Sequence, residues 1–357
     1  MEGTLSINFV GDICFHGFVD SNIKIDESIL KIFQSADLNC GNLESTLTNS
    51  ENQLKGQPIY LKGVPKNNQL FDIFDIYSLA NNHIMDYGVE GLQETIHFLK
   101  KNNKLFFGAG INRVDAEKSL IVEHNGFKIG FIGFTRYNEA NRYNPGTAPY
   151  KIRRICQIVR ELKKNGCFVV VMPHWNYQWV DYPSPFDWGN GHKIINAGAD
   201  IIIGAHPHIL QGIEVYKGKY IFHSLGNFLF ERTKYSKESE KLGKTLILNL
   251  TIKPDFSYET IEHFIHSDGL SLNILNDKEI AKVVTHLKNI SSPLTNRKEL
   301  SRLFYKNSII IDKNTNFVFK EMKKAHGWGS VIKDLMRANR QDIKKRAFSI
   351  YVKYFAK

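Results

Sequence analysis

The stretch Asp200-Ile201-Ile202-Ile203-Gly204-Ala205-His206-Pro207-His208 joins a short apolar run to two imidazoles. Pro207 fixes its own φ and restricts the residue before it, so both histidines have limited directions. A single histidine behind a strand more often forms a hydrogen bond within a loop than it binds a metal. The pattern becomes informative when several strands end in the same way, because ligands at neighbouring strand ends converge on one edge of a sheet.

Five further polar clusters follow apolar runs in the chain. The apolar runs are Leu5–Val10, Ala36–Cys40, Phe74–Ala80, Phe168–Met172 and Tyr220–His223. The clusters behind them read Gly11-Asp12-Ile13-Cys14, Gly41-Asn42-Leu43-Glu44, Asn81-Asn82-His83, Pro173-His174-Trp175 and Ser224-Leu225-Gly226-Asn227. If each cluster had only a local role, potential metal ligands would have to occur by chance at every one of these strand ends. The clusters therefore predict one metal-centred active site at the edge of a sheet.

Residues 1–250 alternate between strand and helix patterns. Asn125-Gly126 is a strong type I′ hairpin signal between Ser119–Glu123 and Lys128–Phe134. Late strands at Thr245–Ile252 and Tyr258–Ile265 have no helix between them. Helices are expected at Asp26–Gln34, Gly88–Lys101, Lys151–Asn165 and Gly191–Ala197. This order predicts an α/β layered sandwich.

From about Asn276 the chain turns helical and polar, so we expect a main domain at 1–275 and a mostly helical extension at 276–357. Two segments, Tyr137–Pro149 and Glu231–Lys244, have no clear periodicity or are almost wholly polar. Both are expected to lie beside the strand ends that carry the clusters. Each is therefore either a substrate lid or an ordinary solvated loop.

The composition and the lengths of the apolar runs argue against a membrane-spanning or secreted protein. An apolar content of 42% and a charged content of 23% are ordinary for a soluble globular chain. No apolar run approaches the roughly 20 residues that span a bilayer, and Met1–Val10 lacks the features of a secretory signal. The four cysteines have no CxxC spacing, which favours free thiols in a reducing compartment. We therefore expect a cytoplasmic protein.

The net charge of +11 is unevenly distributed. Val331–Lys357 contains eight Lys or Arg and two Asp, so this short tail carries +6. A local excess of this kind argues against nucleic acid as a partner. The tail has apolar residues near the helical period, which is typical of a basic amphipathic helix. Such a helix either lies on an anionic membrane, here the inner face, or packs on its own domain.

The clusters together supply ligands for one or two divalent metal ions, with Mn, Zn or Fe as the expected elements. The predicted ligands are two carboxylates, one amide oxygen and three imidazoles, namely Asp12, Glu44, Asn82, His174, His206 and His208. His83 follows Asn82 and has Asp86 within reach of its ring. A histidine oriented by a carboxylate suits a general acid. Asp86 is equally suited to cap the helix expected at Gly88–Lys101.

At this point the sequence resembles the CapA/PgsA family of capsule and poly-γ-glutamate biosynthesis proteins, a branch of the calcineurin-like metallophosphoesterase superfamily. The resemblance covers about residues 5–250. It rests on Val10-Gly11-Asp12, Gly41-Asn42-Leu43-Glu44, Ser78-Leu79-Ala80-Asn81-Asn82-His83-Ile84-Met85-Asp86-Tyr87-Gly88, Gly198-Ala199-Asp200 through Gly204-Ala205-His206-Pro207-His208, and Ser224-Leu225-Gly226-Asn227-Phe228. It implies a four-layer α/β-β/α metallophosphatase-like sandwich, here followed by a helical C-terminal extension.

The resemblance also implies roles for the ligands. Asp12 and His208 would hold one metal, Glu44 would bridge, and Asn82, His174 and His206 would hold the other. His83 takes the position of the superfamily's general acid. Three departures stand out. Cys14 occupies the third position of an Asp-x-His motif, Gln178 ends a motif that usually reads His-Trp-Gly-x-Glu, and the N-terminal membrane anchor common in the family is not expected here.

The expected function is a metal-dependent phosphoesterase-like hydrolase of bacterial capsule or surface-polymer biosynthesis, acting on a surface-polymer or phosphoester substrate. A bridging hydroxide would attack while His83 protonates the leaving group. Arg136 and Asn227 are candidates for binding the substrate, or else brace loops. The alternatives are metal-assisted amide chemistry on a polyglutamate-like polymer, and a non-catalytic polymer-binding or export accessory protein.

Overall fold

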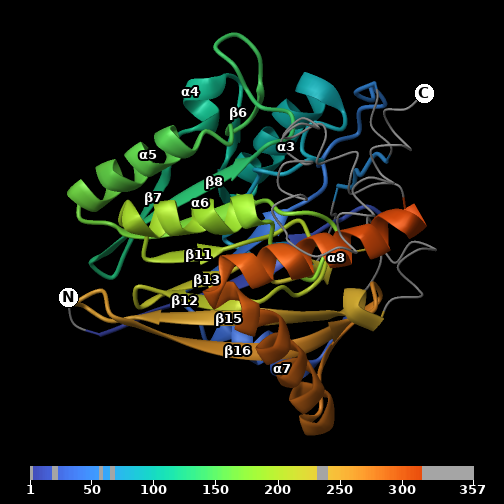
Figure 1. The fold of residues 1–357 in the computed structure, drawn as a ribbon. Helices are drawn as coiled ribbons and strands as arrows, with labels where there is room; N and C mark the ends of the chain where they lie inside the picture. Colours follow the sequence, from blue (N-terminus) through green and yellow to red (C-terminus); the bar gives the residue numbers. More distant parts are fainter. Residues whose placement is uncertain (1–2, 18–22, 56–58, 65–68, 231–239, 316–357) are drawn as a thin grey trace, which may run out of the picture.

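The structure, a computed structural model, describes residues 3–17, 23–55, 59–64, 69–230 and 240–315 (Figure 1). The basic tail at 331–357 lies outside the described residues, as does most of the segment at 231–244 that was considered as a lid. Among the described residues, no helix is both long enough and apolar enough to cross a membrane.

The first sheet is built around parallel strands from the N-terminal half of the chain. Its order is β2-β17-β16-β15-β1-β3-β4-β5, and β14 also pairs with β1. The pairs joining β1, β3, β4 and β5 are parallel, whereas β15, β16 and β17 add antiparallel strands on the other side of β1. The strands are β1 (Leu5–Ile13), β2 (Lys24–Ile25), β3 (Leu38–Leu43), β4 (Ile76–Ser78), β5 (Leu105–Phe107), β14 (Asn227–Leu229), β15 (Lys244–Ile252), β16 (Tyr258–Ser267) and β17 (Ser271–Ile274).

The second sheet has the order β12-β13-β11-β10-β8-β7. The predicted hairpin joins β7 to β8, and both Asn125 and Gly126 have the positive φ that a type I′ turn requires. Its strands are β7 (Leu120–His124), β8 (Phe127–Thr135), β10 (Phe168–His174), β11 (Ile201–Ile203), β12 (Ile213–Tyr216) and β13 (Lys219–Phe222). A separate two-stranded sheet pairs β6 (Ala109–Gly110) with β9 (Gly146–Thr147), which lies within the segment 137–149.

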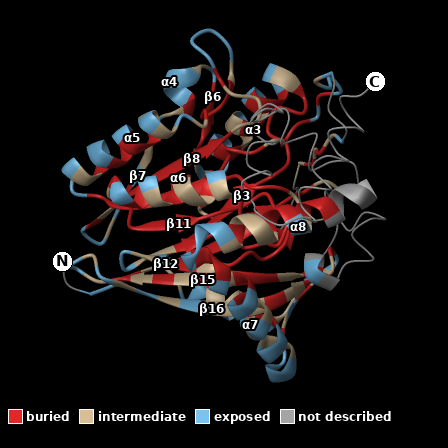
Figure 2. Cartoon of the chain, viewed as in Figure 1, coloured by how far each residue is buried: buried red, intermediate tan, exposed pale blue. Residues whose placement is uncertain are grey.

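The two sheets pack face to face, and helices cover their outer faces (Figures 1 and 2). Alternation within strands explains this arrangement. Phe168 and Val170 of β10 meet the first sheet, while Val169 between them joins the outer cluster with α5 and α6. The outer helices are α1 (Glu27–Gln34), α2 (Gln69–Ile73) and α3 (Gly88–Lys101) on the first sheet, and α5 (Ile152–Lys164) and α6 (Pro185–Asn196) on the second. A short helix, α4 (Arg113–Ala116), lies beside β6. The predicted four-layer sandwich is confirmed.

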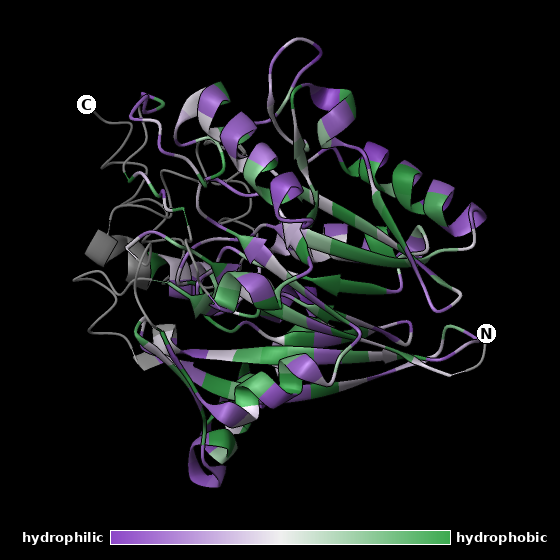
Figure 3. Ribbon diagram, turned by 180° about the vertical axis from the view of Figure 1, so that it is seen from behind, coloured by the Kyte–Doolittle hydropathy of each residue, from purple (hydrophilic) through white to green (hydrophobic). Residues whose placement is uncertain are grey.

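Strands and helices also differ in their hydropathy. The strands are coloured mostly as hydrophobic, whereas the outer helices alternate between hydrophobic and hydrophilic turns (Figure 3). The helix predicted at 191–197 in fact begins at Pro185. Ser184 accepts a hydrogen bond from the backbone N–H of Asp187, and Pro185 suits the first turn because it needs no N–H partner there.

The predicted helical C-terminal region is confirmed as far as the structure describes it, to residue 315. It comprises α7 (Asp277–Ser291), the 3₁₀ turn Ser292–Thr295 and α8 (Arg297–Thr315). Asn276 and Glu279 form a reciprocal capping box at the start of α7. Val283 and Leu287 of α7 belong to the core cluster between the sheets. In α8, Phe304 contacts Tyr177. These helices therefore complete the packing of the sandwich.

Gly11 allows a close backbone approach that shapes the metal-ligand edge. A Cβ at this position would lie 1.9 Å from the carbonyl oxygen of Gly226. That carbonyl accepts a 3.0 Å hydrogen bond from Asp12 N, and the register sets Asp12 beside Asn227. The absence of a side chain at residue 11 therefore lets β14 approach β1.

We expect Gly11→Ala to lower the free energy of unfolding by about 1–3 kcal/mol, because the added methyl group cannot be accommodated without moving backbone. Urea denaturation followed by circular dichroism measures the change. Gly189→Ala in α6 is the matched control, since a Cβ there meets no atom within 4 Å, and its stability should equal or slightly exceed that of the wild type. Equal stability of Gly11→Ala and wild type would contradict the inference that β14 can approach β1 only because residue 11 lacks a side chain.

Candidate metal centre

The predicted ligands come from both sheets and meet where the parallel strands end. Asp12 lies in β1, and Glu44 directly follows β3. His174 is the last residue of β10. Asn82 follows β4, and His206 and His208 follow β11. The carboxyl ends of the strands therefore converge as the sequence predicted.

The ligand atoms form two groups that share Glu44. One group contains Glu44, His174 and His206, and the other contains Asp12, Glu44 and His208. Within each group the ligand atoms lie within 4.8 Å of one another, and all of these residues are buried. The family resemblance implies the same two sets, and metal binding by either set stays a prediction. Each group could hold a metal ion.

The first group also includes Asn82. Its Oδ1 lies 2.6 Å from Nε2 of His174, and the same nitrogen lies 2.9 Å from Nδ1 of His206. Oε1 of Glu44 is 3.4 Å from His174 Nε2. One amide oxygen, one carboxylate oxygen and one imidazole nitrogen thus lie within 3.4 Å of His174 Nε2, and this donor set is suited to Mn, Fe or Zn.

The second group is centred on His208. Its Nδ1 lies 3.4 Å from Oδ2 of Asp12 and 3.8 Å from Oε2 of Glu44. Asn227, which was predicted to bind substrate, has its Oδ1 2.8 Å from the same ring nitrogen. Asn227 therefore contacts a candidate ligand of the group that contains Asp12, Glu44 and His208.

Glu44 provides the test of whether metal ions fit this centre. Both of its carboxylate oxygens are buried, and neither has a hydrogen-bond partner. A buried carboxylate in this state is costly unless a cation compensates it. Since one oxygen faces the His174 group and the other faces His208, the side chain suits a ligand shared by two cations.

Electrostatics within the centre are strongly perturbed. Burial and the neighbouring Asp12 raise the pKa of Glu44 well above its usual range. Burial would also raise the pKa of Asp12, but contacts with His208 and His174 outweigh it and lower that pKa. Burial lowers the pKa of His174 to about 3, which keeps its ring neutral and able to bind a metal. Against the effect of burial, Glu44 and Asp12 raise the pKa of His208 to about 9.

The backbone that carries His206 and His208 is strained. Their φ angles are 98° and 61°, in a region that residues other than glycine rarely adopt. Pro207 lies between them, and its carbonyl accepts a hydrogen bond from Trp179 N. Strain of this kind persists only where the surrounding structure enforces it, and it concentrates at functional sites.

Asp86 holds the ring of His83. Its Oδ2 lies 2.8 Å from His83 Nδ1 and also accepts a 2.7 Å hydrogen bond from Leu61 N. Helix α3 has Tyr87 as its N-cap residue, with no side-chain cap hydrogen bond. The alternative in which Asp86 caps this helix is therefore wrong, and Asp86 instead orients His83.

Neither ligand group contains Cys14, although it occupies the position of a family ligand. The side chain is fully buried, and burial together with the Glu44 charge raises the pKa of its thiol. His16 is bonded elsewhere, since its Nδ1 lies 3.0 Å from the carbonyl oxygen of Lys62. The geometry favours a small buried residue at position 14.

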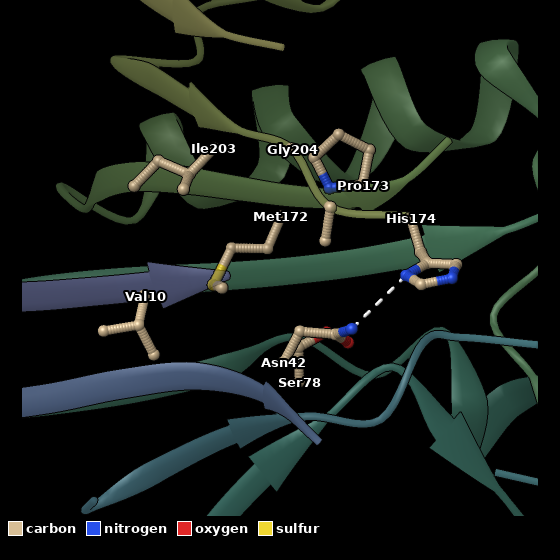
Figure 4. A pocket seen from close by; sticks show the side chains of 9 residues that line it. Val10, Asn42, Ser78, Met172, Pro173, His174, Ile203 and Gly204 are labelled. Carbon is tan, nitrogen blue, oxygen red and sulfur yellow. Dashed lines mark hydrogen bonds between the residues drawn. The ribbon is translucent and has the colours of Figure 1, made fainter. Parts of the chain in front are cut away.

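Sequence reasoning missed Asn42 and Tyr137. Asn42 Nδ2 donates to Asp12 Oδ1 at 2.8 Å. It also lies 3.3 Å from His174 Nδ1 (Figure 4), so it contacts candidate ligands from both sheets. A signal for Asn42 was available, because it precedes Glu44 by two residues, a spacing that puts side chains on one face of an extended chain. The Tyr137 hydroxyl lies 3.2 Å from His206 Nε2. Nothing in the sequence around Tyr137 indicates this contact.

Arg136, the other predicted substrate ligand, forms an ion pair instead. Its Nη2 lies 2.5 Å from Oδ1 of Asp187, and its guanidinium stacks on the rings of Tyr150 and Tyr177. Asp187 and the packed rings therefore fix the position of Arg136, which favours the alternative that this side chain braces a loop.

The fold and the buried carboxylate–imidazole centre define an α/β-β/α sandwich with a candidate metal centre between its sheets. The chain belongs to the family described as bacterial capsule synthesis protein PGA_cap, which matches residues 6–232. The predicted resemblance to the CapA/PgsA family is thereby confirmed.

Curated relatives carry related names. The chain is 35% identical over 245 residues to the PGA biosynthesis protein CapA of Bacillus subtilis, covering 65% of this chain and 64% of that protein. It is 36% identical over 167 residues to the capsule biosynthesis protein CapA of Bacillus anthracis, covering 44% of this chain and 41% of that protein. The chain thus spans less than two thirds of the length of these relatives.

Solved structures show weaker likeness. One is a crystal structure titled as a novel phosphatase from Mycoplasma pneumoniae, at 11% identity and a TM-score of 0.43, covering 74% of this chain and 95% of that one. Another is a hypothetical protein from Thermus thermophilus, at 12% identity and a TM-score of 0.41, covering 72% of this chain and 99% of that one.

Proposed function

We propose that this protein is a metal-dependent hydrolase of the phosphoesterase type that works in the synthesis of a bacterial capsule or surface polymer. The observation that carries the proposal is Glu44, whose two buried and unbonded carboxylate oxygens lie between two groups of ligands. Membership of the capsule synthesis family supports the biological setting.

Each residue of the centre has a proposed role. Asp12, Glu44 and His208 would hold one divalent cation, and Glu44, Asn82, His174 and His206 the other. Cations at such a centre polarise a phosphoryl or carbonyl oxygen and lower the pKa of an attacking water. His83 would pass a proton to the leaving oxygen. Asp86 supports this role because it binds Nδ1, which orients the ring and leaves Nε2 as the nitrogen that exchanges the proton.

The names of the relatives favour a second candidate substrate. One relative is named as a PGA biosynthesis protein, and another, in Mycobacterium tuberculosis, as a probable polyglutamine synthesis accessory protein. A centre that polarises phosphoryl oxygens can also polarise amide carbonyls. Amide chemistry on a polyglutamate-like polymer, or a role in binding such a polymer without turnover, are therefore the alternatives that the test must separate. Membrane binding through 331–357 stays a prediction from the sequence.

The test uses full-length protein stripped of metal with a chelator and then reloaded with Mn²⁺. We expect hydrolysis of phenyl phosphate or bis(p-nitrophenyl) phosphate that is lost on stripping and restored on reloading. Cleavage of a γ-glutamyl peptide alone would favour the amide alternative, and Mn²⁺ binding without turnover of either substrate class would favour the accessory role. A protein that binds no divalent metal would overturn the proposal.

A further inference from the structure

Three consecutive residues behind β8 contact the surroundings of one candidate metal position. Tyr137 places its hydroxyl 3.2 Å from His206 Nε2, with 5.2 Å between the ring centroids. Asn138 Nδ2 donates to the backbone carbonyl of Asn82 at 3.1 Å. Arg136 binds Asp187. Two of these three contacts are therefore made directly to residues of the group that contains Asn82, His174 and His206.

The third contact reaches His174 through the loop behind it. Oδ2 of Asp187 accepts hydrogen bonds from Asn176 N at 3.2 Å and from the Ser184 hydroxyl at 2.7 Å. Asn176 follows His174 by two residues and has a φ of 63°, so its backbone needs such support. Arg136 fixes Asp187 by pairing with Oδ1. The ion pair thereby stabilises the turn through which the chain leaves His174.

The topology explains why one short segment reaches all three ligands. Strands β8 and β10 are parallel neighbours, and Thr135 is paired in register with His174. The chain leaving β8 therefore runs beside the end of the strand that carries His174. It is also held from the far side, because Asn138 O accepts a 3.0 Å hydrogen bond from Thr147 N and Tyr137 O accepts one from the Thr147 hydroxyl.

The tautomer of His206 follows from its neighbours. Its Nδ1 lies 2.9 Å from His174 Nε2 and so faces the centre, while Nε2 is turned outward to Tyr137. If Nδ1 binds a cation, Nε2 carries the proton, and this N–H donates a hydrogen bond to the Tyr137 hydroxyl oxygen. Hydrogen bonds of this kind fix ring orientation and raise the basicity of a metal-binding histidine.

We propose that Arg136, Tyr137 and Asn138 are positioning residues for the metal position of Asn82, His174 and His206. This inference rests on the proposed function. The other position is contacted by Asn227 from β14, which lies against His208. Asn42 touches both positions, since it donates to Asp12 and lies 3.3 Å from His174 Nδ1. Tyr137 and Asn138 contact His206 and Asn82, so a change in the segment behind β8 weakens that position selectively.

The test measures Mn²⁺ binding by calorimetry and elemental analysis, and uses electron paramagnetic resonance to distinguish a coupled ion pair from a single ion. Wild-type protein should bind two ions. Tyr137→Phe, which removes only the hydroxyl, should weaken one of them about 10–100-fold and leave the other unchanged. Asn138→Gly, which keeps the positive φ of residue 138 accessible, should have the same selective effect. Tyr143→Phe, in the same segment but 79% exposed, is the control and should bind as the wild type does.

A double-mutant comparison identifies the affected position. In a His208→Ala background, where the ion beside Asn82 remains, Tyr137→Phe should weaken that ion. In a His206→Ala background the same change should have no effect. If wild-type protein binds no Mn²⁺, the proposed function fails and this inference fails with it. If wild-type protein binds two ions and Tyr137→Phe binds them with unchanged affinities, or weakens both equally, only this inference is overturned.

Discussion

Replacing Glu44 by glutamine is expected to abolish high-affinity metal binding at both positions. Its two oxygens face different ligand groups, whereas the amide of glutamine carries no negative charge and has only one oxygen to offer. Loss of an outer hydrogen-bond partner already costs about 10–100-fold in metal affinity, so loss of the shared carboxylate should exceed that range at each position. Elemental analysis after dialysis against a metal buffer measures the outcome. Hydrolysis, where present, should fall with the metal content.

The same substitution should not destabilise the metal-free protein. Burial and Asp12 raise the pKa of Glu44, so the folded protein binds this proton more tightly than the unfolded chain does. Its stability therefore falls as pH rises from the ordinary carboxyl pKa toward the raised one. Glu44→Gln removes this cost, and its metal-free melting temperature at neutral pH should equal or exceed that of the wild type. Glu51→Gln is the control, because the Glu51 side chain is 85% exposed. Retention of both metals by Glu44→Gln would show that Glu44 is not the shared ligand.

Replacing His83 by alanine is expected to lower turnover by about 10²–10⁴-fold while both metals stay bound. The ring is held by Asp86 and is absent from both ligand groups. The loss should be large for phenyl phosphate and small for p-nitrophenyl phosphate, since a good leaving group needs little protonation. This contrast separates a proton donor from a residue that only shapes the site.

His206→Ala serves as the comparison for the His83 variant, because it removes a candidate ligand rather than a proton donor. It should lose one metal ion, and its turnover of phenyl phosphate and of p-nitrophenyl phosphate should fall by the same factor. An equal loss of metal in His83→Ala and His206→Ala would mean that His83 is itself a ligand. Equal effects of His83→Ala on the two substrates would exclude the general-acid role.

The layered fold and the convergence of the clusters were predictable because the relevant signals are local. The apolar runs, the Asn125-Gly126 turn and the polar residues behind the strands are each recognisable within a few neighbouring residues. Six candidate ligands could be picked from strand ends before the order of the strands was known, since parallel strands present their carboxyl ends on one edge. That these residues bind metal stays a prediction for the experiments above.

The tertiary structure decided the contacts between residues that are far apart in the sequence and meet only in the folded chain. Arg136 pairs with Asp187, and Tyr137 reaches His206. Neither contact has a local signature, because the partners lie 51 and 69 residues apart in the chain. The contact between Asp86 and His83 was expected from their spacing, and the structure decided only that Asp86 does not cap α3. The sequence by itself determined which strands end in ligands. Only the packing of one sheet on the other determined which side chains meet, since burial leaves each polar group the partners that the closed sandwich brings within hydrogen-bond distance.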